Sequence, residues 1–162
     1  MSARTDFVIG IAEMRVTTDS SAVLVTYALG PCIGLTLYDP QAGVGGLLHA
    51  MMPLSTADAD KAAAKPAMYT DTGVTALLQA LFDRGATRRN IIAKVAGGSA
   101  SLDGAGVFRT GERNHMVLRK ILWKNDILIA AEDVGGTQAR TLILEMATGR
   151  TFVKSNSQVQ EL

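Results

Sequence analysis

Residues 22–38 read AVLVTYALGPCIGLTLY, and this stretch decides the fold. It holds two runs of aliphatic and β-branched residues, 22–27 and 32–38, on either side of the turn residues Gly30-Pro31. Short apolar runs bounded by turn residues are typical of β-strands. The stretch therefore predicts two strands joined by a rigid turn, because the proline ring fixes the backbone there.

The same pattern recurs on both sides of this stretch. Six further runs predict strands at residues 7–11, 44–52, 91–96, 127–131, 141–144 and 151–153. Turn residues separate most of them, at Thr17-Thr18-Asp19-Ser20, Asp39-Pro40, Gly45-Gly46, Gly97-Gly98, Gly135-Gly136 and Gly149. The chain is therefore expected to be built largely from β-sheet.

Two segments have the spacing of helices instead. The first carries an apolar stripe at three- and four-residue spacing, made of Val74, Leu77, Leu78, Leu81 and Phe82. Asp71 or Thr72 would cap this helix, and Gly85 would end it. The second helix is expected over residues 112–124. An alanine-rich stretch, residues 55–65, is expected to be a surface loop rather than a weak helix, because Pro66 disfavours helix in the residue before it.

Size and charge set limits on the function. With 162 residues, 48% of them hydrophobic, the chain can bury about two thirds of its unfolded surface in one core, so a single domain over residues 1–162 is expected. Its 16 basic and 15 acidic side chains leave a formal charge of +1, too little to hold a polyanion, which argues against nucleic acid as a partner. Neither a secretion signal nor an uninterrupted apolar run of about eighteen residues is present, so a soluble, cytoplasmic protein without membrane insertion is expected.

Cys32 is the only cysteine and cannot form an internal disulfide. One cysteine and two histidines are too few for an ordinary zinc site unless carboxylates complete it. Strand alternation places Cys32, with Gly34 and Thr36, on the face opposite the aliphatic Ile33, and the rigid turn before it suits the aiming of a nucleophile. The alternative is a buried, purely structural cysteine, since cysteine is among the most buried residue types.

His49 interrupts an otherwise apolar strand, where an imidazole needs partners for its nitrogens. Taking the proton of a thiol would make the attacking thiolate, and a hydroxyl, such as that of Thr26, would orient the ring. The alternatives are a core histidine with satisfied nitrogens and an ordinary strand threonine. His115 is a competing base, but it lies among charged residues early in a helix and is expected to be solvated.

Glycines at positions 97, 98, 104 and 106 suggest a phosphate-binding loop at first sight. They lack the lysine that follows such a loop and do not open a clear helix. They are therefore interpreted as turns.

Several ordered blocks resemble the chemoreceptor glutamine deamidase family of bacterial chemotaxis, CheD. They are Thr26-Tyr27-Ala28-Leu29-Gly30-Pro31-Cys32, Tyr38-Asp39-Pro40, Gly45-Gly46-Leu47-Leu48-His49-Ala50-Met51-Met52-Pro53, Tyr69-Thr70-Asp71, Ala93-Lys94-Val95-Ala96-Gly97-Gly98, Gly111-Glu112-Arg113-Asn114, Glu132-Asp133-Val134-Gly135-Gly136 and Arg140. Together they extend over about residues 7–154.

The resemblance implies an α+β fold, a layered α/β/β sandwich with two mixed sheets and helices on one side, similar to toxin-type cysteine deamidases. It implies a cysteine-dependent amidohydrolase that converts glutamine side chains of receptor cytoplasmic domains to glutamate and ammonia. Carried over by position, Cys32 is the nucleophile, His49 the general base and acid, and Thr26 the residue that orients the imidazole. A chemotaxis phosphatase, CheC, is the implied partner.

Two positions depart from the family pattern. Pro31 stands where the family usually has serine, and it has no backbone N–H to offer an oxyanion, although the amide of Cys32 remains. Thr137 stands where the family often has asparagine. Both departures bear on the fit of the substrate more than on the chemistry.

Three functions stay open at this stage. The first is deamidation through a thioester, which requires neither metal nor organic cofactor. The second is a binding module that regulates CheC without deamidating anything. The third is methyl-ester hydrolysis on receptor glutamates, which uses the same triad with a different leaving group.

Overall fold

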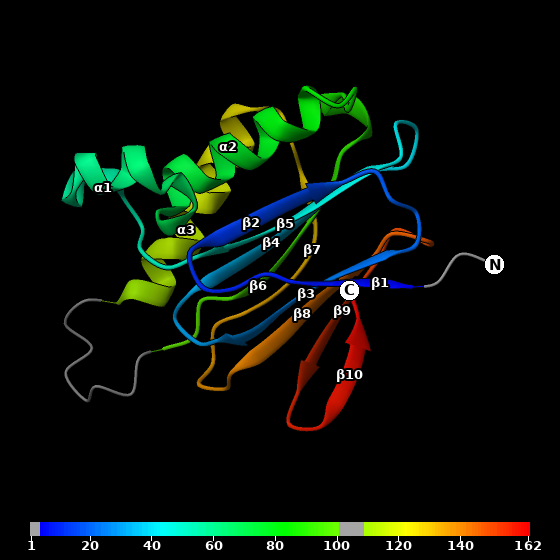
Figure 1. The fold of residues 1–162 in the computed structure, drawn as a ribbon. Coiled ribbons are helices and arrows are strands. Elements are labelled where there is room, and N and C mark those ends of the chain that lie inside the picture. Colours follow the sequence, from blue (N-terminus) through cyan, green and yellow to red (C-terminus); the bar gives the residue numbers. More distant parts are fainter. Residues whose placement is uncertain (1–3, 101–108) are drawn as a thin grey trace.

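Two five-stranded sheets lie face to face in the computed structural model, which describes residues 4–100 and 109–162 (Figure 1). Sheet A has the order β1-β3-β8-β9-β10, with bounds Thr5–Val8, Ala22–Leu29, Arg140–Glu145, Arg150–Ser155 and Gln158–Glu161. Sheet B has the order β2-β5-β4-β6-β7, with bounds Glu13–Thr17, Val44–Ala50, Ile33–Asp39, Ile92–Gly97 and Ile129–Val134. Both sheets are mixed, because β1 runs parallel to β3 and β6 runs parallel to β7.

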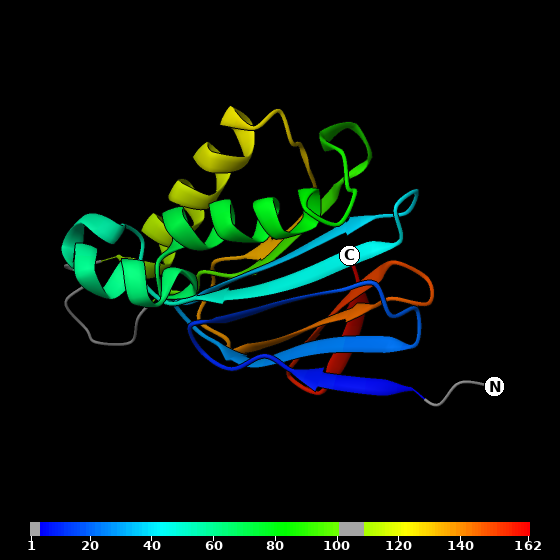
Figure 2. The same ribbon diagram turned by 45° about the horizontal axis from the view of Figure 1, so that its top comes forward.

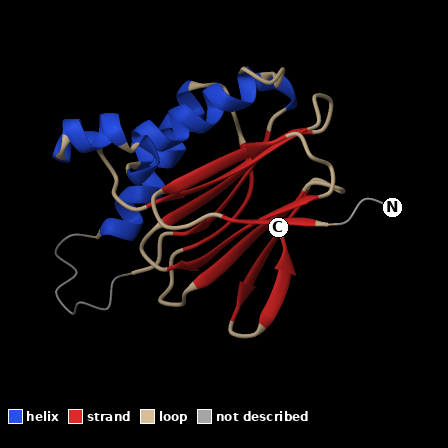
Figure 3. Cartoon of the chain, in the orientation of Figure 1, coloured by secondary structure: helices blue, strands red, loops and turns tan. Residues whose placement is uncertain are grey.

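Helices cover only the outer face of sheet B (Figures 2 and 3). Within the described ranges the α-helices are α1, Ala59–Ala64, α2, Thr70–Phe82, and α3, Thr110–Lys124. Short 3-10 turns lie at Ser55–Ala57, Pro66–Met68 and Arg88–Asn90. The α+β class, the two mixed sheets and the helices on one side therefore agree with the expectation. In the described part of the chain, none of the helices has the length and apolarity needed to cross a bilayer.

The two faces of β4 enter two different cores, as its alternation predicts. Ile33, Leu35 and Leu37 are fully buried among the apolar residues of α2 and α3. Cys32, directly before the strand, lies with Leu29 and Leu142 in the apolar layer between the two sheets. The cysteine therefore belongs to the space between the sheets and not to the helix-covered core.

Gly45 and Gly46 do not form the predicted turn, because both lie inside β5. A Cβ atom at Gly45 would collide with the sulfur of Met146, which directly follows β8 of sheet A. At Gly46 it would lie 2.8 Å from Leu77 of α2. These glycines let sheet B approach its neighbours on both faces, so they serve close packing rather than a change of direction.

The sequence patterns missed three elements. Residues 55–65 are not a plain loop: Asp58 caps α1 by accepting a hydrogen bond from the Lys61 amide, and the helix ends just before Lys65, so Pro66 does not disturb it. Strand β2 was missed because its residues are only half-buried or exposed, and β10 because all four of its residues are exposed.

Other boundaries moved by a few residues. The first strand is Thr5–Val8 rather than 7–11. Helix α2 begins at Thr70, so Asp71 lies within its first turn instead of capping it, and accepts hydrogen bonds from the amide and hydroxyl of Ser55. Helix α3 begins two residues before the expected position 112.

Candidate active site

Thr26 and His49 meet across the gap between the two sheets. Thr26 lies on β3 of sheet A and His49 on β5 of sheet B, and both side chains are fully buried. The Thr26 hydroxyl oxygen is 2.7 Å from Nδ1 of His49. The structure thus brings together two of the three residues that the sequence singled out.

The hydrogen bonds around Thr26 define the tautomer of His49. The Thr26 hydroxyl donates its single proton to the carbonyl of Ile9, at 2.6 Å, since a carbonyl can only accept. The same hydroxyl oxygen must therefore accept from the ring, so Nδ1 of the neutral imidazole carries the proton. The lone pair is then on Nε2, which is buried without a hydrogen-bond partner among the described residues.

Cys32 lies on the same face of sheet B as His49. In the antiparallel pair of β4 and β5, His49 is directly opposite Gly34, two residues after Cys32. Directly opposed residues project to one face, and a residue two positions away is a diagonal neighbour on that face. Within the described residues no hydrogen bond joins the thiol to the imidazole. Nε2 of His49 has no hydrogen-bond partner there, and Cys32 is a free cysteine.

Burial keeps both groups neutral. Desolvation lowers the pKa of His49 from 6.5 to about 4. Desolvation also raises the pKa of the Cys32 thiol, and the residue's own backbone N–H offsets part of that rise. At neutral pH the resting site therefore holds a thiol and an unprotonated imidazole rather than an ion pair.

Gly97 and Gly98 do not form the predicted turn: Gly97 ends β6, Gly98 follows it in irregular backbone, and both lie beside Cys32. Both have positive φ, +107° and +60°. The amide of Gly98 donates to the carbonyl of Cys32 at 2.8 Å, and the amide of Ser99 donates to that of Gly30 at 2.9 Å. A Cβ atom at Gly97 would lie 2.5 Å from the Cys32 carbonyl oxygen, which requires glycine there. Gly104 and Gly106 lie outside the described residues.

His115 is not simply solvated. Its Nε2 lies 2.8 Å from Glu132 of β7, and its side chain is only 18% exposed. It belongs to α3, whereas Thr26 and His49 lie between the sheets. The expectation of a freely solvated histidine was therefore wrong, and its partner is a carboxylate on a different element.

Two residues of this region were not singled out by chemistry in the sequence. Arg140 is buried and donates to the carbonyl of Gly97 at 3.4 Å and to Asp133 at 3.2 Å. Asn114 is fully buried and donates to the carbonyl of Pro31. Only their positions in the ordered blocks could have drawn attention to them, because neither has a local pattern that signals burial.

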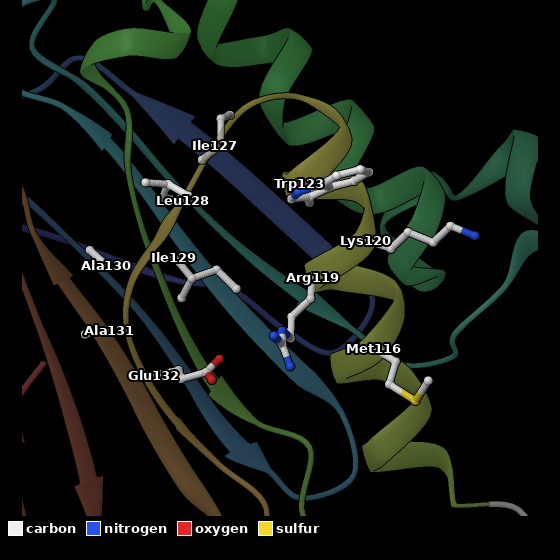
Figure 4. Close-up of a pocket in the computed structure, with 10 residues that line it drawn as sticks. All are labelled: Met116, Arg119, Lys120, Trp123, Ile127, Leu128, Ile129, Ala130, Ala131 and Glu132. Atoms are coloured by element: carbon white, nitrogen blue, oxygen red, sulfur yellow. The ribbon is translucent and has the colours of Figure 1, made fainter.

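Two hollows lie near α3, and neither is lined by Thr26, Cys32 or His49. A groove of about 720 Å³ lies between α3 and β7 and is lined by Arg119, Trp123 and Ile129, among others (Figure 4). A smaller cavity of about 320 Å³ is lined by Gly98, Gly111, His115 and Gly135, among others, and adjoins the backbone that binds Cys32. In the described ranges, no group of three or more Asp, Glu, His or Cys side chains could hold a metal ion.

Comparison with known proteins adds a family. A family model described as CheD chemotactic sensory transduction matches residues 51–155. A probable chemoreceptor glutamine deamidase CheD of Solibacter usitatus is 48% identical over 96% of this chain and 92% of its own length. A CheD protein of the same description from Syntrophus aciditrophicus is 47% identical over 93% of this chain and 94% of its own length.

Among solved structures, the Bacillus licheniformis hypothetical protein YfiH aligns with a TM-score of 0.47 and 12% identity, over 74% of this chain and 49% of that one. The two sequence relatives align over nearly the whole chain at almost half identity. The family model matches residues 51–155 of the same chain. The chain belongs to the CheD family.

Proposed function

We propose that this chain is a protein-glutamine deamidase that hydrolyses glutamine side chains of chemoreceptor cytoplasmic domains, with Cys32, His49 and Thr26 as its triad. One observation supports the proposal most strongly: a buried imidazole whose Nδ1 is hydrogen-bonded to Thr26 and whose Nε2 is unengaged, on the same sheet face as the only cysteine. The names of the relatives, probable chemoreceptor glutamine deamidases, support the substrate.

The acylation step begins from the neutral pair. As the Cys32 sulfur attacks the side-chain carbonyl carbon of glutamine, its proton passes to Nε2 of His49. Forming the imidazolium in this buried place is unfavourable, because the pKa of His49 is lowered to about 4. The Thr26 oxygen offsets part of this cost, because it accepts a hydrogen bond from Nδ1–H and so stabilises the imidazolium. The imidazolium then gives its proton to the leaving amino group, and ammonia departs from a thioester.

Deacylation reverses the roles of the same groups. His49 takes a proton from water, the hydroxide attacks the thioester carbonyl, and the departing sulfur regains that proton. The products are glutamate and free enzyme. Pro31 has no N–H to donate, so the amide of Cys32 is the backbone donor that the loop can offer to the oxyanion.

The deciding experiment compares wild-type protein with Cys32→Ala. Receptor cytoplasmic domains from the host organism are incubated with each, and ammonia and the peptide mass change are measured. Wild-type protein is expected to release ammonia, and Cys32→Ala to release none while keeping the wild-type circular dichroism spectrum and Tm. Release of ammonia by Cys32→Ala at the wild-type rate would rule out the cysteine mechanism.

The product separates deamidation from ester hydrolysis. Hydrolysis of a methyl ester releases methanol and leaves the ammonia concentration unchanged. Deamidation releases ammonia and leaves the methanol concentration unchanged. Methanol without ammonia would replace the proposed reaction with the esterase alternative.

A CheC-type phosphatase is the partner proposed with this function. Cys32→Ala is expected to bind CheC with the affinity of wild-type protein, because half-buried Cys32 offers little surface to a partner. Isothermal titration calorimetry measures both affinities. If neither protein binds CheC, the proposed partner is rejected. A single domain over residues 1–162, similarity to toxin-type cysteine deamidases and a cytoplasmic location likewise belong to the proposal.

A further inference from the structure

Asn114 joins three separate segments with one side chain. It lies on α3 and is fully buried. Its Nδ2 donates to the carbonyl of Pro31 at 2.9 Å and to that of Met51 at 3.1 Å. Its Oδ1 accepts from the hydroxyl of Thr70, at the start of α2, at 2.9 Å. Both protons of the amide and its oxygen are therefore engaged, which fixes the orientation of the group.

The two carbonyls belong to the segments that flank the proposed nucleophile and base, just outside β4 and β5. Pro31 directly precedes Cys32, and Met51 follows His49 by two residues. The backbone pairing of β4 with β5 ends where Ile33 is opposite Ala50, two residues after Pro31 and one residue before Met51. Asn114 binds the two segments just beyond the last β4–β5 pair. Its amide therefore links them where the sheet hydrogen bonds end.

The first turn of α3 also holds this backbone at a second point. Gly111, one turn before Asn114, packs against Gly98 and Ser99 so closely that a Cβ atom would collide with the Ser99 carbonyl oxygen. The amides of Gly98 and Ser99 in turn donate to the carbonyls of Cys32 and Gly30. Residues i and i+3 of a helix share a face, so one face of α3 contacts this backbone twice. Asn114 binds Pro31 directly, and Gly111 packs on Gly98 and Ser99, which bind Cys32 and Gly30.

We infer that Asn114 is a positioning residue for the reaction: by binding the carbonyls of Pro31 and Met51, it fixes the spacing between the Cys32 sulfur and the His49 ring. The inference rests on the proposed function in taking these two residues as nucleophile and base. It also accounts for the tolerance of proline at 31, because the contact uses the carbonyl of that residue and not an N–H.

The first experiment measures deamidation by Asn114→Ala and Asn114→Asp. The aspartate variant keeps the size and the acceptor for Thr70 but loses the two donors. Both variants are expected to lower kcat about 100-fold with KM changed less than about threefold, since a displacement near 1 Å at reacting groups has that effect. Asn125→Ala is the matched control, because Asn125 lies at the other end of α3 and donates to the Ile121 carbonyl at 2.8 Å. It is expected to keep wild-type kcat.

A second control separates positioning from loss of stability. Leu118 is a fully buried residue of α3 that belongs to the helix-side core. Leu118→Ala should lower Tm at least as much as Asn114→Ala, yet retain kcat when assayed well below its Tm. Wild-type kcat in Asn114→Ala, or an equal loss of kcat in Leu118→Ala, would overturn the inference.

The third measurement does not depend on the receptor substrate. Iodoacetamide modifies Cys32 uniquely, because it is the only cysteine. Asn114→Ala and His49→Ala are each expected to lower the alkylation rate at neutral pH about tenfold, and the double variant to react no more slowly than the single ones. Additive effects would overturn the inference. Coupled alkylation rates in a protein that deamidates no receptor would reject the proposed reaction while supporting the positioning role.

Discussion

The carbonyl of Ile9 decides which nitrogen of His49 carries the proton. It takes the only proton of the Thr26 hydroxyl, so the hydroxyl oxygen can only accept from the ring. Nε2 is left as the basic atom, and it is the nitrogen that the proposed mechanism needs to receive the thiol proton. A threonine therefore serves here because its hydroxyl is itself held by a third group, which a free hydroxyl would not achieve.

Thr26→Val is expected to lower kcat about 100-fold, because Nδ1–H and the Ile9 carbonyl both lose their partner and the ring is free to turn. Thr26→Ser keeps the hydroxyl and is expected to stay within about tenfold of wild type. Steady-state deamidation kinetics measure both. Equal activity of the valine and wild-type proteins would show that Thr26 does not orient the base.

The lowered pKa of His49 also predicts how stability depends on pH. In the unfolded chain the imidazole titrates near 6.5, and in the folded chain near 4. Between these values the unfolded state binds more protons, so the free energy of unfolding rises with pH and falls on acidification. A decrease of about 2 kcal/mol is expected from pH 7.5 to about pH 5.

Urea unfolding at the two pH values measures this difference. His49→Gln removes the titrating group, so its decrease should be smaller than that of wild type by about 2 kcal/mol. Identical pH dependence in the two proteins would place the pKa of His49 close to its unfolded value. The same titration predicts that kcat/KM is lost only on acidification toward about pH 4, where the base becomes protonated in the folded enzyme.

Helix α3 acts on the candidate site through its first turn. Its N-terminal residues contact the backbone that carries the cysteine, while its middle residues Leu118 and Leu122 bury their side chains in the helix-side core. The helix is therefore fixed by apolar burial and, as a rigid element, can place Gly111 and Asn114 accurately. Its middle residues thus anchor α3 in the core and its N-terminal residues contact the candidate site, although none of them belongs to the proposed triad.

Gly111→Ala tests this close approach. Its Cβ atom would collide with the Ser99 carbonyl oxygen and lie 2.6 Å from the Gly98 carbonyl oxygen, and neither backbone group can swing aside as a side chain can. The variant is expected to lose about 1–3 kcal/mol of unfolding free energy and most of its activity. Glu112→Ala, at the neighbouring exposed position, is expected to change stability by less than about 0.5 kcal/mol. Chemical denaturation and deamidation assays on both variants decide the matter.

At the scale of the whole molecule, the residues of the proposed triad lie between the two sheets. Cys32 and His49 come from sheet B, and Thr26 comes from sheet A, so the candidate site exists only when the sheets are stacked. The apolar layer between them includes Leu29 and Leu142, which pack closely beneath Gly34. Stability of this layer and integrity of the site are therefore linked.

Leu142→Ala is expected to lower the free energy of unfolding by about 2–5 kcal/mol, because it opens a cavity at a fully buried position between the sheets. Leu128→Ala makes the same chemical change at a side chain that is 84% exposed, and should change stability by less than about 0.5 kcal/mol. Urea midpoints compare the two variants directly. Similar losses in both would contradict the placement of the inter-sheet core.

Local patterns in the sequence determined the alternating faces of β4, most of the strands and the two longer helices. They did so because burial repeats every second residue in a strand and every three to four residues in a helix. Those signals failed where burial is partial, as in β2, or absent, as in β10. The paired glycines at 45 and 46 were misinterpreted because only their tertiary neighbours, Met146 and Leu77, explain why a strand needs them.

The sequence by itself also determined which residue types could do the chemistry: one thiol, an imidazole in an apolar strand and a nearby hydroxyl. Only the tertiary structure decided that Thr26 reaches His49 from the other sheet, that Nε2 is the unengaged nitrogen, and that Asn114 holds Pro31 from 83 positions away. The physical reason is that periodicity reports burial within one element, whereas hydrogen bonds between elements depend on how the sheets and helices stack. A pattern along the chain carries no record of that stacking.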